Sequence, residues 1–178
     1  MDANRFQGEI LPMKNKLYRF AYSLLNDSEE SMDAVQEVFI KLWNIRNKME
    51  TVSSPEAFAM TVTRNYCLDR IKARRTVSLE QTKSIMYTEA DEVGPERRIE
   101  IRDAAGHIRM LMEELPEQQK AVLHLRDIEG YEFEEIEKML DMTVNSIRVN
   151  LSRARKKLRE LYLKRVDNGS EKDKIYTG

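Results

Sequence analysis

The charge of this chain reverses near its C-terminus, inside a stretch that keeps helical spacing throughout. Residues 127–141 carry seven acidic side chains and the single base Lys138, whereas residues 142–165 carry eight basic side chains and the single acid Glu160. Apolar side chains recur at helical spacing through both halves, at Phe133, Ile136, Leu140, Ile147, Leu151 and Leu158. The pattern predicts two packed helices with opposite outer surfaces. A tight turn followed by a cationic helix favours a helix-turn-helix, whose second helix enters the major groove of DNA.

Glycine and proline, which interrupt helices, are scarce along the whole chain. Six glycines and four prolines occur among 178 residues, and good helix formers dominate, so we expect an all-α protein. Ser53 and Glu56 have the spacing of a capping box, and Pro55 suits a first helical turn. The pattern predicts helices at about 10–25, 28–48, 53–75, 99–114 and 116–129, then the acidic helix, and then a basic helix that ends near Lys164.

Two segments are poor in large apolar side chains and lie between or after the helical parts. Residues 76–97 contain several acids and the Gly94-Pro95 breaker, which predicts a flexible linker. Residues 166–178 are mostly polar, which predicts a disordered tail. The chain is therefore expected to hold two small helical domains, at residues 1–75 and 98–165.

Composition and motifs exclude several classes of protein. The net charge is only -1, so any binding to nucleic acid must depend on local patches. No apolar run approaches the roughly 20 residues that cross a bilayer, and the N-terminus lacks the apolar segment of a signal peptide, so we expect a cytoplasmic protein without membrane insertion. Cys67 is the single cysteine, and its apolar neighbours predict a buried thiol. His107 and His124 lie far from it in the sequence, which disfavours a metal site.

Motifs for catalysis are missing from the sequence. It contains no glycine-rich phosphate loop, no nucleophile motif and no zinc-ligand spacing. Acidic pairs such as Glu134-Glu135 are more simply explained as solubilising surface. We therefore expect no enzymatic activity, no cofactor and no small-molecule substrate.

The basic helix has the layout of a recognition helix. Thr143 is placed to N-cap it, so that its first turns face base edges. Arg148 and Arg153 suit guanine edges in the major groove, and the bases from Arg155 onward suit phosphates. The alternative is an amphipathic helix whose basic side chains only keep it soluble. The dense clustering of basic side chains favours contact with DNA. A second basic patch closes the third helix, at Arg70, Lys72, Arg74 and Arg75.

Three segments resemble the sigma-70 family of bacterial RNA polymerase initiation factors, in the extracytoplasmic-function (ECF) branch that keeps only regions 2 and 4. Residues 33–43, DAVQEVFIKLW, resemble the segment that docks on the coiled coil of the polymerase β′ subunit. Residues 55–75, PEAFAMTVTRNYCLDRIKARR, resemble the helix that reads the -10 promoter element. Residues 115–162 resemble region 4, which reads the -35 element. Two ordered motifs are far more specific than a lone helix-turn-helix.

The resemblance implies a role for each of three residue sets. Binding to core polymerase is implied for Asp33, Gln36, Glu37, Lys41 and Asn44. Contact with the -10 element is implied for Ser53, Ser54, Arg64, Asn65, Arg70, Lys72 and Arg74, with an intrahelical Asn65–Asp69 pair as an equal alternative for Asn65. Contact with the -35 element is implied for Asn145, Ser146, Arg148, Val149, Ser152, Arg153, Arg155, Lys156 and Lys157. The implied partners are core RNA polymerase through its β′ and β subunits, promoter DNA, and an anti-sigma factor that is often membrane-anchored.

The sequence also departs from the family pattern. Phe58 stands where tryptophan is usual, Glu137 where a small alanine packs between the two helices, and Asp141 where glycine often makes the turn. A carboxylate at position 137 must snorkel or pair, for example with a base of the next helix. Trp43, at the edge of an apolar stripe, fits the core slightly better than an interface.

Two other functions fit parts of the pattern. A stand-alone helix-turn-helix regulator leaves the 33–43 match unexplained. A sigma mimic that only sequesters an anti-sigma factor has no need of the two basic patches.

Overall fold

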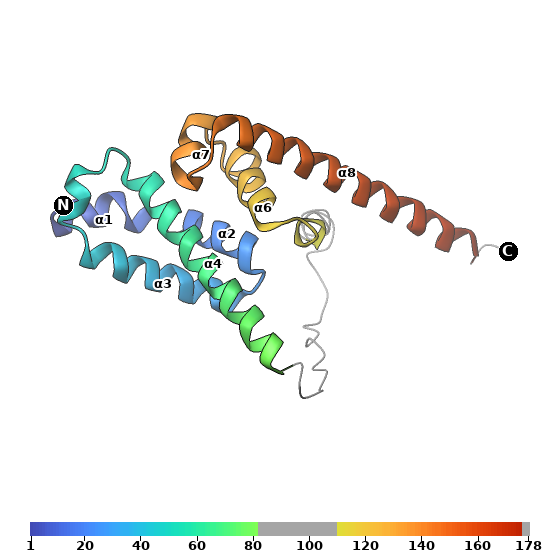
Figure 1. Cartoon of the computed structure of the whole chain (residues 1–178), viewed down its shortest axis with the longest axis horizontal. Helices are drawn as coiled ribbons and strands as arrows, with labels where there is room; N and C mark the ends of the chain where they lie inside the picture. The colour runs from blue at the N-terminus through green and yellow to red at the C-terminus, as the bar shows by residue number, and fades with distance from the viewer. Residues whose placement is uncertain (82–109, 176–178) are drawn as a thin grey trace.

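The computed structural model describes residues 1–81 and 110–175, with side chains described within residues 1–76 and 110–165. These residues form helices and turns without a strand, which confirms the all-α prediction. The N-terminal unit consists of α1 (Ala3–Glu9), the 3₁₀ turn η1 (Leu11–Met13), α2 (Lys14–Leu25), α3 (Ser28–Asn44), the 3₁₀ turn η2 (Lys48–Thr51) and α4 (Pro55–Gln81). The C-terminal unit consists of α6 (Glu117–Leu123), the π-helical turn η3 (His124–Ile128), α7 (Phe133–Leu140) and α8 (Val144–Ile175). Figure 1 shows α8 extending well beyond the rest of the molecule.

An apolar core holds α2, α3 and α4 together. The apolar stripe of α3 is buried at Val35, Val38 and Leu42, each exposed by 3% or less. Burial of one such side chain stabilises the fold by about 1.5–3 kcal/mol. Cys67 of α4 is fully buried in the same cluster, and burial raises the pKa of its thiol to about 12. This confirms the prediction of a buried thiol.

Several N-terminal helix boundaries differ from the prediction. The helix predicted at 10–25 is interrupted because Pro12 lies in η1, and α2 begins only at Lys14. The first helix, α1, was not predicted because it buries a single apolar side chain, Phe6, and so has no periodic stripe. Helix α3 ends at Asn44 rather than near residue 48.

The N-cap of α4 is also one residue later than predicted. The backbone N–H of Ala57 donates to Ser54 Oγ at 3.1 Å, so Ser54 and not Ser53 is the capping residue. Pro55 then takes the first helical position, where a missing N–H costs nothing. The carboxylate of Glu56 is not used in a capping box; it accepts a hydrogen bond from Lys16 Nζ at 2.5 Å.

The two long helices run further than predicted. Helix α4 continues past Arg75 to Gln81, so the predicted linker begins as helix. Helix α8 continues past Lys164 to Ile175, through residues that were predicted to form a disordered tail. Extending a formed helix costs far less than starting one, so weak helix formers can follow a strong segment. The rest of the predicted linker and the start of the helix predicted at 99–114 lie outside the described residues.

The C-terminal unit contains the predicted helix-turn-helix. Gly130 has a φ of 79° where the chain leaves η3, and Glu132 with Glu135 forms a capping box at the start of α7. Asp141 ends α7 in the left-handed conformation, with φ 51° and ψ 50°. Aspartate tolerates this conformation better than most residues, so it replaces the glycine usual at this turn.

The two units pack against each other along one seam. Helix α2 contacts α6 and η3, and α4 contacts α7; Figure 1 shows α2 and α6 beside each other. Buried side chains of both units belong to one apolar cluster. The sequence did not determine whether the units touch; the structure shows that they do.

His124 is a buried histidine at this seam. Its side chain is 3% exposed, and its ring centroid lies 5.4 Å from that of Phe20 on α2. Burial lowers the pKa of His124 to about 4, although Glu129, whose carboxylate lies 3.3 Å from Nε2, acts in the opposite direction. The imidazole is therefore neutral in the folded chain at pH 7, and the nearby charged groups are Glu129 and Arg19.

Acid is expected to destabilise the fold through this histidine. Between pH 7 and pH 5 the unfolded chain binds a proton at position 124 and the folded chain does not, so the free energy of unfolding falls by about 2 kcal/mol. Denaturant unfolding of the chain and of His124→Gln at both pH values measures this difference. The variant should lose correspondingly less stability on acidification, and an equal loss in both proteins would contradict the assignment.

Candidate nucleic-acid interface

The recognition helix is held by a buried contact between α7 and α8. Ile136 and Leu140 of α7 and Ile147 and Leu151 of α8 are each exposed by 4% or less. The backbone N–H of Ser146 donates to Thr143 Oγ1 at 3.2 Å, so Thr143 is the predicted N-cap of α8. This packing fixes which side of α8 faces outward.

The outward side of α8 carries the predicted -35 contacts. Asn145, Val149, Ser152 and Lys156 follow one another at helical spacing and are all exposed. Arg148 and Arg153 flank them, both also exposed, while Ser146 is half-buried. The guanidinium of Arg148 lies 5.1 Å from the Phe133 ring centroid, a cation–π contact that orients it at the start of the helix.

Two basic residues predicted to contact the -35 element instead hold α8 against the rest of the C-terminal unit. Arg155 makes two hydrogen bonds to Asp127, at 2.9 and 2.6 Å, and this pairing raises the pKa of Arg155. Lys157 Nζ donates to the backbone carbonyl of Glu114 at 2.7 Å. In contrast, Arg153 makes no ion pair with any residue that the structure describes. Arg155 and Lys157 would therefore have to give up a contact within the chain before they could bind DNA, whereas Arg153 would not.

Glu137, the departure from the family pattern at the crossing of α7 and α8, has a structural role. Its Oε1 accepts a hydrogen bond from the backbone N–H of Val144 at 3.2 Å, the first residue of α8. The carboxylate thus pairs with the backbone of the next helix and not with one of its bases. Together with Thr143 it satisfies two of the free N–H groups at the start of the recognition helix.

Loss of this cap should weaken the helix-turn-helix. Glu137→Ala leaves the Val144 N–H without its acceptor and is expected to lower the free energy of unfolding by about 1 kcal/mol, as the loss of an N-cap does. Chemical denaturation measures the change. The exposed Glu134→Ala on the same helix is the control and should change stability by less than about 0.5 kcal/mol. An unaltered stability of Glu137→Ala would show that the cap is not needed.

The predicted -10 contacts are distributed over three sides of α4 and its preceding turn. Ser53, Asn65 and Lys72 are exposed, whereas Ser54 is used as the N-cap. Arg70 and Arg74 both pair with Glu30 of α3, with Arg74 Nε donating at 3.0 Å. Arg64 is half-buried and faces the C-terminal unit. The structure therefore does not gather these seven side chains on one surface.

The predicted docking residues for core polymerase lie together on the outer side of α3. Asp33, Gln36, Glu37, Lys41 and Asn44 are all exposed. The same helix also exposes apolar side chains that the sequence argument had not assigned to an interface: Met32 is 51%, Ile40 55% and Trp43 40% exposed. Trp43 was expected in the core slightly more than in an interface; its ring packs edge-on against Phe6 at 5.1 Å, and the Arg46 guanidinium lies 4.3 Å from its centroid. These side chains are recognised as interface candidates because they are both apolar and exposed. Helical periodicity in the sequence does not show which apolar side chains remain exposed.

Comparison with known proteins agrees with this architecture. The sigma-70 region 2 family matches residues 10–77, and the sigma-70 region 4 family matches residues 106–158. The chain is 25% identical over 151 residues to the ECF RNA polymerase sigma factor SigE of Mycolicibacterium smegmatis, covering 84% of this chain and 58% of that protein. It is 23% identical over 167 residues to the ECF RNA polymerase sigma factor SigW of Bacillus subtilis, covering 89% of each chain.

Solved structures show the same fold. The sigma factor RpoE of Bartonella quintana, in complex with the anti-sigma factor NepR, superposes with a TM-score of 0.73 at 22% identity, covering 90% of this chain and 98% of that one. CnrH, in complex with the cytosolic domain of CnrY, superposes with a TM-score of 0.64 at 19% identity, covering 90% and 89%. The chain therefore belongs to the sigma-70 family of RNA polymerase sigma factors, in its ECF branch.

Membership of this family confirms the prediction of a sigma factor rather than an enzyme, because sigma factors have no catalytic activity of their own. Within the described residues no cluster of histidine, cysteine, aspartate or glutamate could hold a metal ion. None of the described helices combines the length and the apolar character that crossing a membrane requires. From here the N-terminal unit is called region 2 and the C-terminal unit region 4.

Proposed function

We propose that this ECF sigma factor docks on the β′ subunit of core RNA polymerase through the outer side of α3 and directs the enzyme to promoters with two elements. Helix α8 reads the -35 element in duplex DNA and α4, with its preceding turn, contacts the -10 element. The observation that carries the proposal is the exposed, N-capped basic side of α8 on a chain that also has a region 2. A decoy for an anti-sigma factor needs no such surface.

The contacts of α8 indicate which of its side chains bind DNA bases, which binds phosphate and which position the helix. Arg148 and Arg153 project from the first turns, where a recognition helix meets base edges, and bidentate pairing of arginine with guanine supplies about 1–3 kcal/mol of discrimination. Lys156 lies further along the same side and suits a phosphate. Arg155 and Lys157 hold α8 in place through Asp127 and the Glu114 carbonyl, so their effect on DNA binding is through position as well as charge.

The α3 surface combines charge with apolar area. Met32 and Ile40 are more than half exposed beside acidic and amide side chains. Exposed apolar side chains surrounded by polar ones are typical of a protein interface, in which a few such side chains supply most of the binding energy. The solved complexes of RpoE with NepR and of CnrH with CnrY favour a further partner, an anti-sigma factor, for this cytoplasmic protein.

Binding to the polymerase is the first test of the proposal. The purified chain is mixed with sigma-free core RNA polymerase and passed through a size-exclusion column. Co-elution of the chain with core, abolished by an excess of another sigma factor that docks on the same β′ surface, is the expected result. Elution of the chain apart from core at micromolar concentration would contradict the proposal.

A further inference from the structure

A cavity of about 330 Å³ lies beside α2. Tyr18 and Tyr22 of α2 line it on one side, and Met112 and Ile128 of region 4 line it on the other. The two tyrosine rings are stacked, with their centroids 6.1 Å apart. An apolar cavity of about 150 Å³ is enough to hold benzene, and binding sites for small molecules begin at about 300 Å³. The cavity is therefore large enough for a molecule of two fused rings.

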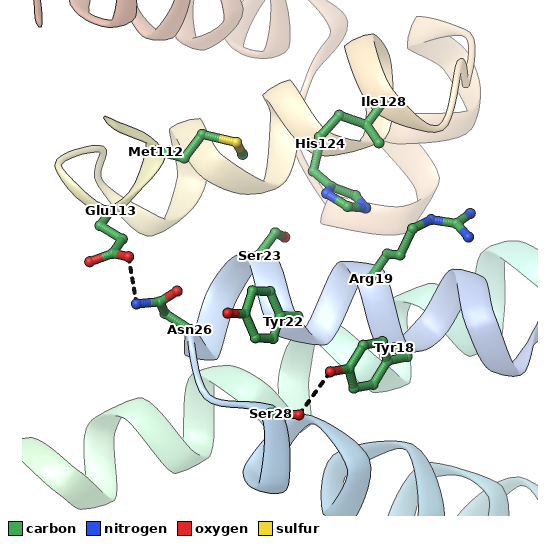
Figure 2. Close-up of a pocket in the computed structure, with 10 residues that line it drawn as sticks. All are labelled: Tyr18, Arg19, Tyr22, Ser23, Asn26, Ser28, Met112, Glu113, His124 and Ile128. Atoms are coloured by element: carbon green, nitrogen blue, oxygen red, sulfur yellow. Dashed lines mark hydrogen bonds between the residues drawn. The ribbon is translucent and has the colours of Figure 1, made fainter. Parts of the chain in front are cut away.

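His124 is the buried polar side chain of this cavity. It is 3% exposed, and neither of its ring nitrogens has a hydrogen-bond partner among the described residues. The Oε1 atom of Glu129 lies 3.3 Å from Nε2 but is not aligned for a hydrogen bond. Figure 2 shows the imidazole ring pointing from η3 toward α2. Because buried polar atoms nearly always have a partner, this imidazole is suited to a hydrogen bond with a bound molecule.

A π-helical turn positions the histidine in the cavity. The backbone N–H of Glu129 donates to the carbonyl of His124 at 3.0 Å, and both His124 and Ile128 line the cavity. Turns of this kind are rare and occur frequently at functional sites. His124 and Met112 are buried, whereas Ile128 is 52% exposed. The cavity therefore has a buried inner end and a mouth that is open to solvent.

The charged side chains of the lining already make hydrogen bonds within the chain. Arg19 donates two of them to Glu129, from Nε at 2.8 Å and from Nη2 at 2.9 Å. Figure 2 shows Asn26 donating to the Glu113 carboxylate, at 2.6 Å. The buried His124 imidazole is neutral, so one of its ring nitrogens is an acceptor. The lining therefore favours a neutral ligand that carries a hydrogen-bond donor.

We propose that this cavity binds a small, neutral aromatic molecule of two fused rings with one N–H or O–H group, and that His124 accepts the hydrogen bond from that group. The size of the cavity sets the number of rings. The Tyr18 and Tyr22 rings favour a flat aromatic ligand, because aromatic rings pack well in offset stacks. The inference goes beyond the proposed function and does not depend on it, since binding at this cavity needs neither polymerase nor promoter.

Indole and benzofuran test the site on the full chain. The two molecules share one shape, but only indole carries an N–H group. By isothermal titration calorimetry we expect indole to bind at one site with a Kd of about 100 µM or lower. Benzofuran should bind at least about tenfold more weakly, because it leaves the imidazole without its partner. Absence of saturable indole binding up to about 1 mM, or equal affinity for the two molecules, would overturn the proposal.

His124→Leu tests the acceptor. Its preference for indole over benzofuran should disappear, while benzofuran binds within about threefold of its affinity for the parent chain, since the apolar lining remains. General loosening of the fold would weaken both molecules alike and keep their ratio. A preference for indole that persists in His124→Leu would therefore overturn the assignment of the hydrogen bond to this histidine.

Ile128→Trp tests the location without changing a buried residue. Ile128 is 52% exposed at the mouth, so the larger ring should be tolerated by the fold, fill the cavity and weaken indole binding at least about tenfold. The matched control is Leu11→Trp, because Leu11 is 44% exposed in η1 and does not line the cavity. It should bind indole as the parent chain does. Unchanged binding in Ile128→Trp, or an equal loss in Leu11→Trp, would overturn the proposal.

Discussion

Reversing two charges on α8, Arg148→Glu with Arg153→Glu, is expected to reduce promoter-specific transcription at least about 100-fold while core polymerase still binds. Both side chains are exposed on the outward side of the recognition helix. Each bidentate contact of arginine with guanine is worth about 1–3 kcal/mol, and the introduced carboxylates add repulsion from phosphates. Runoff transcription and size-exclusion binding to core measure the two activities separately.

The control for this variant has the same change in net charge. Arg5 and Lys14 are exposed in region 2, on α1 and at the start of α2, outside both proposed DNA surfaces, so Arg5→Glu with Lys14→Glu should retain transcription within a few-fold. A parallel loss of core binding in the α8 variant would contradict the assignment of these arginines to DNA. An equal loss of transcription in the control would also contradict this assignment, because the loss would then depend on net charge alone.

Placing two acids on the exposed apolar part of α3 is expected to remove binding to core polymerase. Met32 and Ile40 are 51% and 55% exposed, so Met32→Asp with Ile40→Asp should cost little stability. Central apolar contacts of an interface cost 2 kcal/mol or more each on truncation, and a buried carboxylate costs more. We therefore expect the Kd for core to rise at least about 100-fold, measured by titration with a fluorescently labelled chain.

The control uses the same two positions. Met32→Leu with Ile40→Leu keeps the apolar surface and should bind core within about threefold of the parent chain. Normal core binding by the diacid variant would show that α3 docks through its polar residues alone or is not the docking surface. Both variants should have the unfolding midpoint of the parent chain, which shows that a change in core binding is not caused by unfolding.

The helix-turn-helix was predictable from the sequence because several local signals agree there. The apolar spacing of α7 and α8, the Thr143 cap and the turn at Asp141 all specify the same geometry, and the structure contains each of them. The helix boundaries that were missed had no such agreement. Phe6 alone gives α1 no period, and the ends of α4 and α8 depend on helix extension through residues that have no strong preference.

The candidate sites were predictable in their location and less so in their detail. The outer sides of α3 and α8 follow from the buried stripe, because what is not core on a helix faces outward. Pairing across the fold does not follow from periodicity. Arg155 with Asp127, Arg74 with Glu30 and Arg19 with Glu129 join residues that are distant in sequence, and only the packed structure brings them together.

Transcription from genomic DNA tests the central claim most directly. The purified chain is added to sigma-free core polymerase with the host genome as template, and the 5′ ends of the transcripts are mapped. We predict a set of discrete start sites that is absent without the chain, each preceded by shared sequences near positions -10 and -35, and lost with Arg148→Glu and Arg153→Glu. Transcripts that are the same with and without the chain, together with failure of the chain to bind core, would contradict its assignment as a promoter-specific initiation factor.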